Sequence, residues 1–309
     1  MLTIKYGDCR NVLATLPAQS VHCCVTSPPY FGLRDYGVAG QIGLEATPDA
    51  YVAELVAVFA EVRRVLRDDG ALWLNLGDSY ASAWACNRRS EIGNGSMLNG
   101  KRKDRPNRLT GGLKEKDLIG IPWRVAFALQ ADGWYLRQDI IWSKPNPMPE
   151  SVTDRCTKAH EYIFLMSKQA RYFYDADAIR EPQQSLGERH EGKSGYREDY
   201  PIKYGFSERS LHPLGRNRRS VWEVASQPFA GAHFATFPPD LIEPCIKAGC
   251  PKGGTVLDPF GGAGTTGLVA DRLGRNAILI ELNPDYMAMA ERRIRDDAGM
   301  FAEVEVPLP

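Results

Sequence analysis

The segment TVLDPFGGAGTTGLVADRLG, residues 255–274, joins a short apolar run to a helical pattern through a glycine-rich turn. Gly262, Gly264 and Gly267 match G-x-G-x-x-G in the strand, turn and helix context that this pattern requires. The next apolar run ends in Glu281, about 20 residues on, where a carboxylate can accept the hydrogen bonds of a ribose diol. We therefore expect a nucleoside-binding α/β fold, rather than a glycine turn that serves only helix packing.

Short apolar runs alternate with helical patterns along the rest of the chain. Strand length and composition are found at residues 21–27, 71–77, 137–144, 161–168, 255–260 and 277–282. Helical spacing of apolar residues runs from Val52 to Leu66, ending near Gly70, and from Ile121 to Leu129, ending near Gly133. This alternation predicts a Rossmann-like fold, a mostly parallel sheet with helices on both faces, whose ligands bind at the carboxyl ends of the strands.

The residues around the glycine turn narrow the choice of cofactor. A P-loop carries Gly-Lys-Ser/Thr, whereas Gly264 is followed by Thr265 and Thr266, which disfavours a nucleoside triphosphate. Asp258 stands beside the loop, where a carboxylate suits a ligand with an ammonium group better than a pyrophosphate. S-adenosyl-L-methionine carries both an ammonium and a sulfonium group, so the loop favours it.

A second strand end carries the sequence TSPPYFG, residues 26–32. Proline fixes its own φ, lacks an N–H and pushes the preceding residue toward an extended conformation. Two prolines in succession therefore hold the carbonyl groups of Ser27 and Pro28 in fixed directions. We interpret the turn as a rigid pair of hydrogen-bond acceptors, and not only as a stiff exit from a strand.

With TSPPY followed far downstream by DPFGGAGTT, the chain resembles the S-adenosylmethionine-dependent amino-methyltransferases of DNA, in the motif order of their beta group. Similar segments cover nearly the whole chain: YGDCRNVLATLPAQSVHCCVTSPPY, WSKPNPMPES at 142–151 and HFATFPPDLIEPCI at 233–246. The resemblance implies a methyltransferase fold with permuted motif order and loop-rich DNA-recognition insertions. It also implies catalytic roles for Ser27, Pro28, Pro29 and Tyr30.

The resemblance further implies where S-adenosyl-L-methionine binds. Asp8 is expected at the adenine edge, the segment before the glycine loop at the methionine end, and Glu281 at the ribose. The implied cofactor-binding residues are Asp8, Thr26, His233, Ala235, Phe237, Asp258, Phe260, Gly262, Gly264, Thr265, Thr266 and Glu281.

Basic residues are concentrated in two segments although the formal net charge is zero. Residues 86–116 contain nine basic and three acidic residues, and residues 179–220 contain nine and six. Both segments are also rich in Gly, Asn, Ser and Pro, which is typical either of solvated loops or of basic arms that close on a polyanion. We interpret them as DNA-binding arms.

By analogy with the family, residues 1–174 and 229–309 form the catalytic and cofactor-binding domain, with a basic insertion at 84–116. Residues 175–228 are the candidate target-recognition region. The candidate DNA-binding residues are Arg88, Arg89, Lys101, Arg102, Lys103, Lys144, Arg216, Arg218 and Arg219.

The first residue of the catalytic turn bears on the target base. In this family a turn that begins with Ser usually goes with cytosine N4 and one that begins with Asp with adenine N6, so Ser27 predicts cytosine and leaves adenine as the alternative. The base would be flipped out of the duplex to stack on Tyr30. A protein or RNA methyltransferase fits the basic segments less well, and a binding module without catalysis fits the intact motifs less well.

The remaining features exclude several other classes of protein. The seven cysteines form no CxxC pair, which predicts free thiols and no metal site, and Cys245 falls in a helix-like run, unlike the nucleophile of a C5 methyltransferase. His160 and Glu161 could form an acid/base pair, but a histidine just before a buried strand is more typical of a structural residue. Asp78 fits equally well as a turn or cap residue or as a contact to the base. The absence of an apolar run of about 18 residues and of a signal peptide predicts a cytoplasmic protein without a membrane partner.

We expect duplex DNA as the partner of this chain, which would act as a monomer or homodimer. A cognate restriction endonuclease would be a functional partner in a restriction-modification system, and an orphan or phage modification enzyme is the alternative setting.

Overall fold

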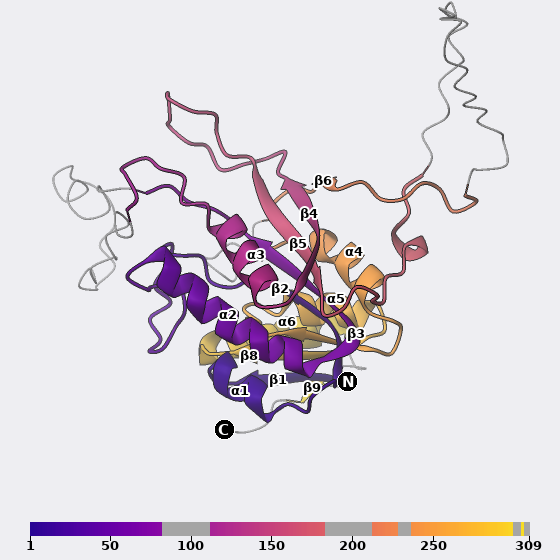
Figure 1. The fold of residues 1–309 in the computed structure, drawn as a ribbon. Helices are drawn as coiled ribbons and strands as arrows, with labels where there is room; N and C mark the ends of the chain where they lie inside the picture. The colour runs from indigo at the N-terminus through magenta and orange to yellow at the C-terminus, as the bar shows by residue number, and fades with distance from the viewer. Residues whose placement is uncertain (82–111, 183–211, 228–235, 299–303, 306–309) are drawn as a thin grey trace, which may run out of the picture.

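The computed structural model describes residues 1–81, 112–182, 212–227, 236–298 and 304–305 (Figure 1). A nine-stranded sheet in the order β6-β4-β5-β3-β2-β7-β8-β1-β9 forms its centre. The strands are β1 (Leu2–Tyr6), β2 (Val21–Thr26), β3 (Leu66–Leu76), β4 (Tyr135–Ser143), β5 (His160–Ser167), β6 (Val221–Glu223), β7 (Thr255–Asp258), β8 (Asn276–Glu281) and β9 (Val304–Glu305). Among these strands β5 alone runs antiparallel to its neighbours β3 and β4, which confirms a mostly parallel sheet.

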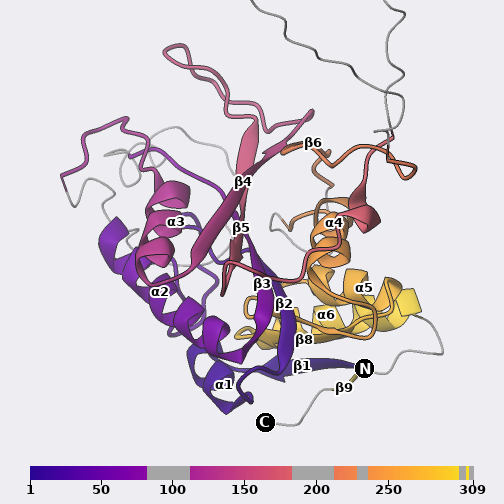
Figure 2. The same cartoon turned by 45° about the vertical axis from the view of Figure 1, so that its right-hand side comes forward.

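Helices cover both faces of the sheet, as Figures 1 and 2 show. One layer contains α1 (Cys9–Thr15), α2 (Pro48–Val65) and α3 (Ile121–Ala131), and the other contains α4 (Pro239–Gly249), α5 (Thr265–Arg272) and α6 (Pro284–Ala298). A short 3-10 helix, η2 (Asp177–Ile179), contacts α4. Each layer has its own core, with Phe31, Tyr51 and Phe59 buried in the first and Trp73 and Trp142 in the second.

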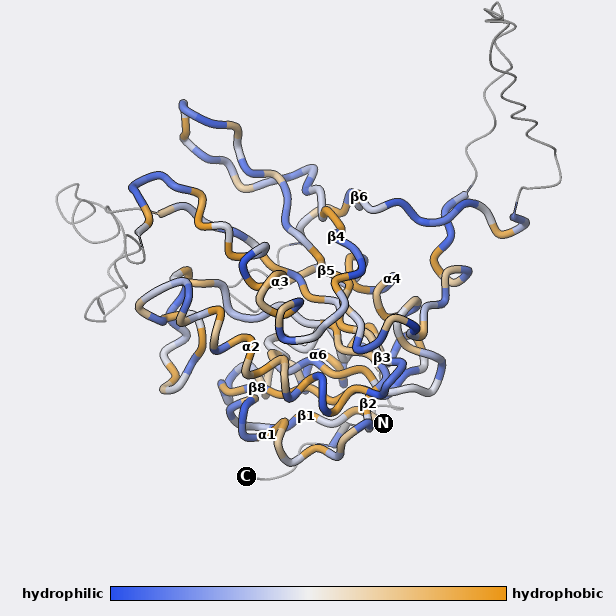
Figure 3. The backbone as a smooth tube through the Cα atoms, in the orientation of Figure 1, coloured by the Kyte–Doolittle hydropathy of each residue, from blue (hydrophilic) through white to orange (hydrophobic). Residues whose placement is uncertain are grey.

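Every strand predicted from an apolar run is present in the structure. The predictions for β2 and β3 succeeded because these central strands are buried on both faces. In β2 only His22 is less than fully buried, and β3 is buried from Gly70 to Leu76. Such strands give continuous apolar runs in the sequence. Figure 3 shows the apolar colour along these strands and a largely polar connection between β4 and β5.

Local signals explain the start of α2, whereas its end differs from the prediction. Thr47 caps α2 by accepting a hydrogen bond from the Ala50 N–H, and Pro48 occupies the first turn. The helix ends at Val65, and Gly70 lies within β3, so the predicted end near Gly70 is several residues late. A Cβ at Gly70 would lie 3.1 Å from the His22 carbonyl oxygen, so this glycine permits close strand pairing.

The ends of the candidate target-recognition region belong to the same body as the sheet. β6 pairs in parallel with β4, and Trp222 packs in the second core together with Ile179 of η2. The described parts of this region therefore pack into the same body as the central sheet. Across the described ranges, no helix has the length and apolar character needed to cross a membrane.

Candidate active site

A cavity opens at the carboxyl ends of β1, β2, β7 and β8. Its wall combines the turn after β2, the glycine loop after β7, the end of β8 and a segment between β2 and α2. The lining residues are Gly7, Asp8, Cys9, Ser27, Pro28, Pro29, Tyr30, Leu33, Arg34, Tyr36, Val38, Gly40, Gln41, Ile42, Thr236, Phe237, Asp258, Pro259, Phe260, Gly261, Gly262, Ala263, Thr265, Glu281, Leu282, Asn283, Tyr286 and Met289. The fold thus brings TSPPY and the glycine loop to one cavity.

Asp258 connects the two motifs. One carboxylate oxygen accepts hydrogen bonds from the Thr26 hydroxyl at 2.6 Å and the Phe260 N–H at 3.0 Å, and the other accepts from the Thr266 hydroxyl at 2.6 Å. Burial raises the pKa of this carboxyl, whose residue is 2% exposed. Thr266 is fully buried and is not among the residues that line the cavity. Its hydroxyl group holds the Asp258 carboxylate in place.

Glu281 stands at the end of β8 on the opposite side of the glycine loop. Its carboxylate accepts hydrogen bonds from the backbone N–H groups of Gly262 at 2.7 Å and Asn283 at 2.8 Å. Burial raises the pKa of the Glu281 carboxyl. These two bonds fix a carboxylate at the cavity wall next to the loop.

The glycines of the loop have different tasks. Gly262 adopts φ of 50° and lines the cavity, so a ligand can approach its backbone. Gly264 has φ of 75° and lies behind the lining, where a Cβ would come within 2.8 Å of the Ala290 Cβ in α6. Gly267 would similarly meet Leu2 and Leu279 at 2.9 Å. The pattern therefore serves both the cavity and the packing of α5.

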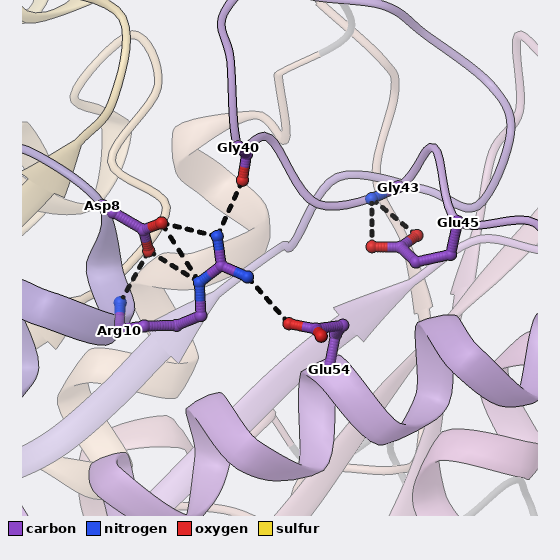
Figure 4. A network of polar contacts seen from close by, with 6 residues as sticks. All are labelled: Asp8, Arg10, Gly40, Gly43, Glu45 and Glu54. Atoms are coloured by element: carbon purple, nitrogen blue, oxygen red, sulfur yellow. Dashed lines mark hydrogen bonds and ion pairs between the residues drawn. The ribbon is translucent and has the colours of Figure 1, made fainter.

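Asp8 lines the cavity and caps α1, accepting a hydrogen bond from the Arg10 N–H (Figure 4). The Arg10 side chain also bonds the Asp8 carboxylate and reaches Glu54 of α2 and the Gly40 carbonyl, both at 2.8 Å. The Arg10 side chain holds the pKa of the Asp8 carboxyl below its usual value. Arg10 thereby connects the candidate adenine side of the cavity to the 33–42 segment, a role that its place in the sequence did not predict.

The TSPPY turn is held from several sides. The Tyr51 hydroxyl donates a hydrogen bond of 2.8 Å to the Pro29 carbonyl. Within the described part of the chain, no group donates to the Pro28 carbonyl. The Tyr30 hydroxyl donates to the Glu161 carboxylate at 2.6 Å, and burial raises the pKa of this phenol well above its usual value.

Only some of the predicted site residues lie in the described part of the chain. His233 and Ala235 lie outside the described residues, as do Arg88, Arg89, Lys101, Arg102 and Lys103. Phe237 and Phe260 line the cavity, together with Thr236, which the sequence did not single out. Thr265 also lines it, and its hydroxyl accepts a hydrogen bond from Arg293 at 2.8 Å.

The described DNA-binding candidates are engaged with protein groups. Lys144 forms an ion pair with Glu161. Arg216 and Arg219 both pair with Glu181, at 3.1 and 3.2 Å. The Arg218 guanidinium lies over the Trp222 ring, 4.6 Å from its centre.

The remaining candidates have structural environments. Asp78 accepts hydrogen bonds from the Gly120 and Ile121 N–H groups and so caps α3. The His160 ring packs edge-on against Tyr162. Cys245 is a buried free thiol in α4, and burial raises its pKa, which does not suit a nucleophile. In the described residues, no group of three or more His, Cys, Asp or Glu side chains forms a metal site.

Comparison with known proteins agrees with this arrangement. Residues 21–292 match the model of a family described as DNA methylase. The chain is 50% identical to Type II methyltransferase M.XycI of Xanthomonas campestris pv. cyanopsidis, over 95% of this chain and 87% of that protein. It is 48% identical to M.Cfr9I of Citrobacter freundii, over 96% and 88%.

Solved structures show the same fold. A Thermus thermophilus protein assigned as a DNA modification methylase, complexed with S-adenosyl-L-methionine, superimposes with a TM-score of 0.63 at 26% identity over 100% of both chains. The cytosine-N4-specific PvuII DNA methyltransferase gives a TM-score of 0.62 at 19% identity, over 99% of this chain and 94% of that one, a likeness of fold alone. The match over residues 21–292 and the 50% identity to a Type II methyltransferase establish that the chain belongs to the DNA methylase family.

Proposed function

We propose that this DNA methyltransferase transfers a methyl group from S-adenosyl-L-methionine to the exocyclic N4 of a cytosine flipped out of duplex DNA. One observation carries the proposal: the Ser27–Tyr30 turn lines the same cavity as Asp258 and Glu281. Two potential acceptors of the turn thus line the same cavity as two carboxylates that can hold a cationic nucleoside.

The residues of the cavity fit S-adenosyl-L-methionine. Glu281 would accept hydrogen bonds from the ribose diol, and Asp258 would favour the ammonium end, because a buried carboxylate attracts a cation strongly. Asp8 and Arg10 border the adenine side. Phe237 and Phe260 offer apolar contacts in the same wall.

The chain's contribution to the reaction is orientation. When bound, S-adenosyl-L-methionine would supply an electrophilic methyl group to the lone pair of an amino nitrogen. The sulfonium would become the thioether of S-adenosylhomocysteine, and the methylated nitrogen would release one proton to solvent. The lone pair of an exocyclic amine is delocalised into its ring, so the Ser27 hydroxyl and the Pro28 carbonyl would accept its N–H hydrogens and turn the lone pair toward the methyl. The Tyr30 ring would stack on the base, a contact worth about 1 to 3 kcal/mol.

Ser27 supports cytosine N4 as the target, since turns that begin with Ser usually go with that base. Adenine N6 is the second candidate, because the same pair of acceptors suits the N–H hydrogens of either amino group. Duplex DNA is the proposed substrate, with Arg216, Arg218 and Arg219 near β6 as backbone contacts. Type II methyltransferases among the relatives support a restriction-modification setting.

Analysis of the methylated nucleoside tests the proposal. The protein is incubated with mixed-sequence duplex DNA and methyl-labelled S-adenosyl-L-methionine, and the DNA is digested to nucleosides. We expect the label in N4-methylcytosine. Label in N6-methyladenine would establish the second candidate, and label in neither nucleoside would refute both.

A further inference from the structure

A buried polar cluster lies directly behind the TSPPY turn. β5 runs antiparallel to β3 and β4, so its first residues lie at the same edge of the sheet as the carboxyl ends of those strands. Figure 2 shows the three strands side by side. The reversed direction of β5 brings three residues close to Tyr30, which lies in the turn after β2. They are Asn75 of β3, Glu161 of β5 and Lys144, which follows β4.

Glu161 is the centre of this cluster. Its Oε2 atom accepts hydrogen bonds from the Tyr30 hydroxyl at 2.6 Å and from the Asn75 amide at 3.3 Å. A phenol-to-carboxylate bond of this length is charge-assisted and stronger than a bond between neutral groups. The carboxylate therefore fixes the end of the Tyr30 ring.

Lys144 completes the cluster from the other side. Its ammonium group pairs with Oε1 of Glu161 and lies 4.2 Å from the centre of the Trp142 ring. The side chains of Lys144 and Glu161 are only 20% and 15% exposed. A largely buried carboxylate is strongly destabilised when its cationic partner is removed, so the ion pair with Lys144 supports Glu161 in this position.

The Tyr30 ring is also confined along its edge. A Cβ at Gly77 would lie 2.5 Å from the Tyr30 Cε2 atom, so the ring occupies the space that this glycine leaves open. The Asn75 amide donates to the Tyr162 carbonyl at 3.1 Å, which in turn holds the amide that contacts Glu161. The edge and the hydroxyl group of the Tyr30 ring are thus both held in place, so the ring is restricted to one orientation.

We propose that Glu161 is a positioning residue for methyl transfer: with Lys144 as its counter-ion, it holds the Tyr30 hydroxyl so that the ring stands ready to stack on the target base. The inference rests on the stacking role proposed for Tyr30. It explains why a strongly charged pair lies next to a cavity where the transfer itself needs no strong base.

Kinetic analysis of Glu161→Ala and Tyr30→Phe tests the inference, with unmethylated genomic DNA and methyl-labelled S-adenosyl-L-methionine as substrates. Each variant removes one side of the Tyr30–Glu161 hydrogen bond, and Tyr30→Phe also removes the longer bond of 3.3 Å to the Asn75 side-chain oxygen. We expect kcat to fall by about 10- to 100-fold in each, the range for a lost bond to a charged group, with the cofactor Kd within about twofold of wild type. The double variant should be no slower than the slower single variant, because the bond can be lost only once.

A variant in which both Glu161 and Lys144 are replaced by neutral side chains separates loss of the hydrogen bond from misfolding caused by an unpaired charge. In Glu161→Gln/Lys144→Met the glutamine oxygen can still accept from Tyr30, and no charge is left without a partner. We expect this variant to recover kcat to within about fivefold of wild type. The control is Glu243→Ala, which breaks an exposed ion pair with Lys247 on α4 outside the cavity and should leave kcat unchanged.

The outcomes separate this inference from the proposed function. If Tyr30→Ala lowers kcat but Tyr30→Phe and Glu161→Ala do not, the stacking role stands and the positioning role of Glu161 is overturned. Multiplicative losses in the double variant, or a paired neutral variant as slow as Glu161→Ala, would also overturn it. If Tyr30→Ala leaves kcat unchanged, the stacking role itself fails.

Discussion

Thr26 and Asp258 end neighbouring strands, and the Thr26 hydroxyl donates a hydrogen bond of 2.6 Å to the Asp258 carboxylate. Both side chains are buried, at 0% and 2% exposure. The bond joins the end of β2, where the TSPPY turn begins, to the end of β7, where the glycine loop begins. The two motifs are therefore linked by one buried hydrogen bond between residues 232 positions apart in the sequence.

Thr26→Val removes this hydroxyl while keeping the shape of the side chain. Asp258 would lose one of its side-chain donors inside the protein, so we expect the free energy of unfolding to fall by about 1 to 3 kcal/mol, measured by urea denaturation. Thr15→Val is the matched control, since the Thr15 hydroxyl bonds the Val12 carbonyl at an exposed site. A loss no larger than that of the control would mean that the Thr26 bond contributes little.

Gly264→Ala is expected to destabilise the protein for two reasons, a φ of 75° and a Cβ placed 2.8 Å from the Ala290 Cβ. Gly253→Ala separates them, because Gly253 has φ of 74° and no atom within 4 Å of an added Cβ. The control should lose about 1 kcal/mol from backbone strain alone. Gly264→Ala should lose roughly 1 to 3 kcal/mol more by overpacking, measured as the difference in unfolding free energy. Equal losses would contradict the close packing of α5 on α6.

The strand ends were predictable because both motifs are local. Gly262 and Glu281 act through their own strand and loop, and a periodic pattern is enough to place them in an α/β sheet. The same holds for the strand that ends at Thr26. The G-x-G-x-x-G pattern could not show which of its residues contact the cavity and which serve packing. Gly264 packs against α6, and Thr266 supports Asp258.

Long-range contacts account for most of what the sequence did not reveal. Arg10 reaches Glu54 and Gly40, and Tyr51 reaches the Pro29 carbonyl, and no local spacing indicates these partners. Glu161 lies in a segment of strand-like composition, and its contact with Tyr30 depends on the reversed direction of β5. Lys144 was a candidate DNA-binding residue, and no sequence pattern indicated its ion pair with Glu161.

Glu281→Ala should weaken cofactor binding before it affects the transfer step. The substitution removes the proposed acceptor of the ribose diol and frees the Gly262 and Asn283 N–H groups that the carboxylate now binds. We expect the Kd of S-adenosyl-L-methionine to rise about 10- to 100-fold, with kcat at saturating cofactor within about threefold of wild type. Isothermal titration calorimetry measures the Kd without DNA. An unchanged Kd would remove Glu281 from the cofactor site.

Asp8→Asn should lower stability in a way that depends on pH. Asparagine retains a side-chain oxygen that caps α1, so the change removes mainly the ion pair with Arg10. Because Arg10 lowers the pKa of the folded-state carboxyl, the pair stabilises the protein above the unfolded pKa of about 3.9 and is lost as the pH falls through the lower folded value.

The unfolding free energies of wild type and Asp8→Asn should therefore differ by about 0.5 to 1 kcal/mol at pH 7, and the difference should shrink progressively as the pH falls below about 4, as urea denaturation across this pH range can measure. Asp49→Asn is the control, because its ion pair with Arg124 is long, at 3.4 Å, and the Asp49 side chain is 81% exposed. A difference that stays constant with pH would show that the Asp8 charge does not stabilise the fold.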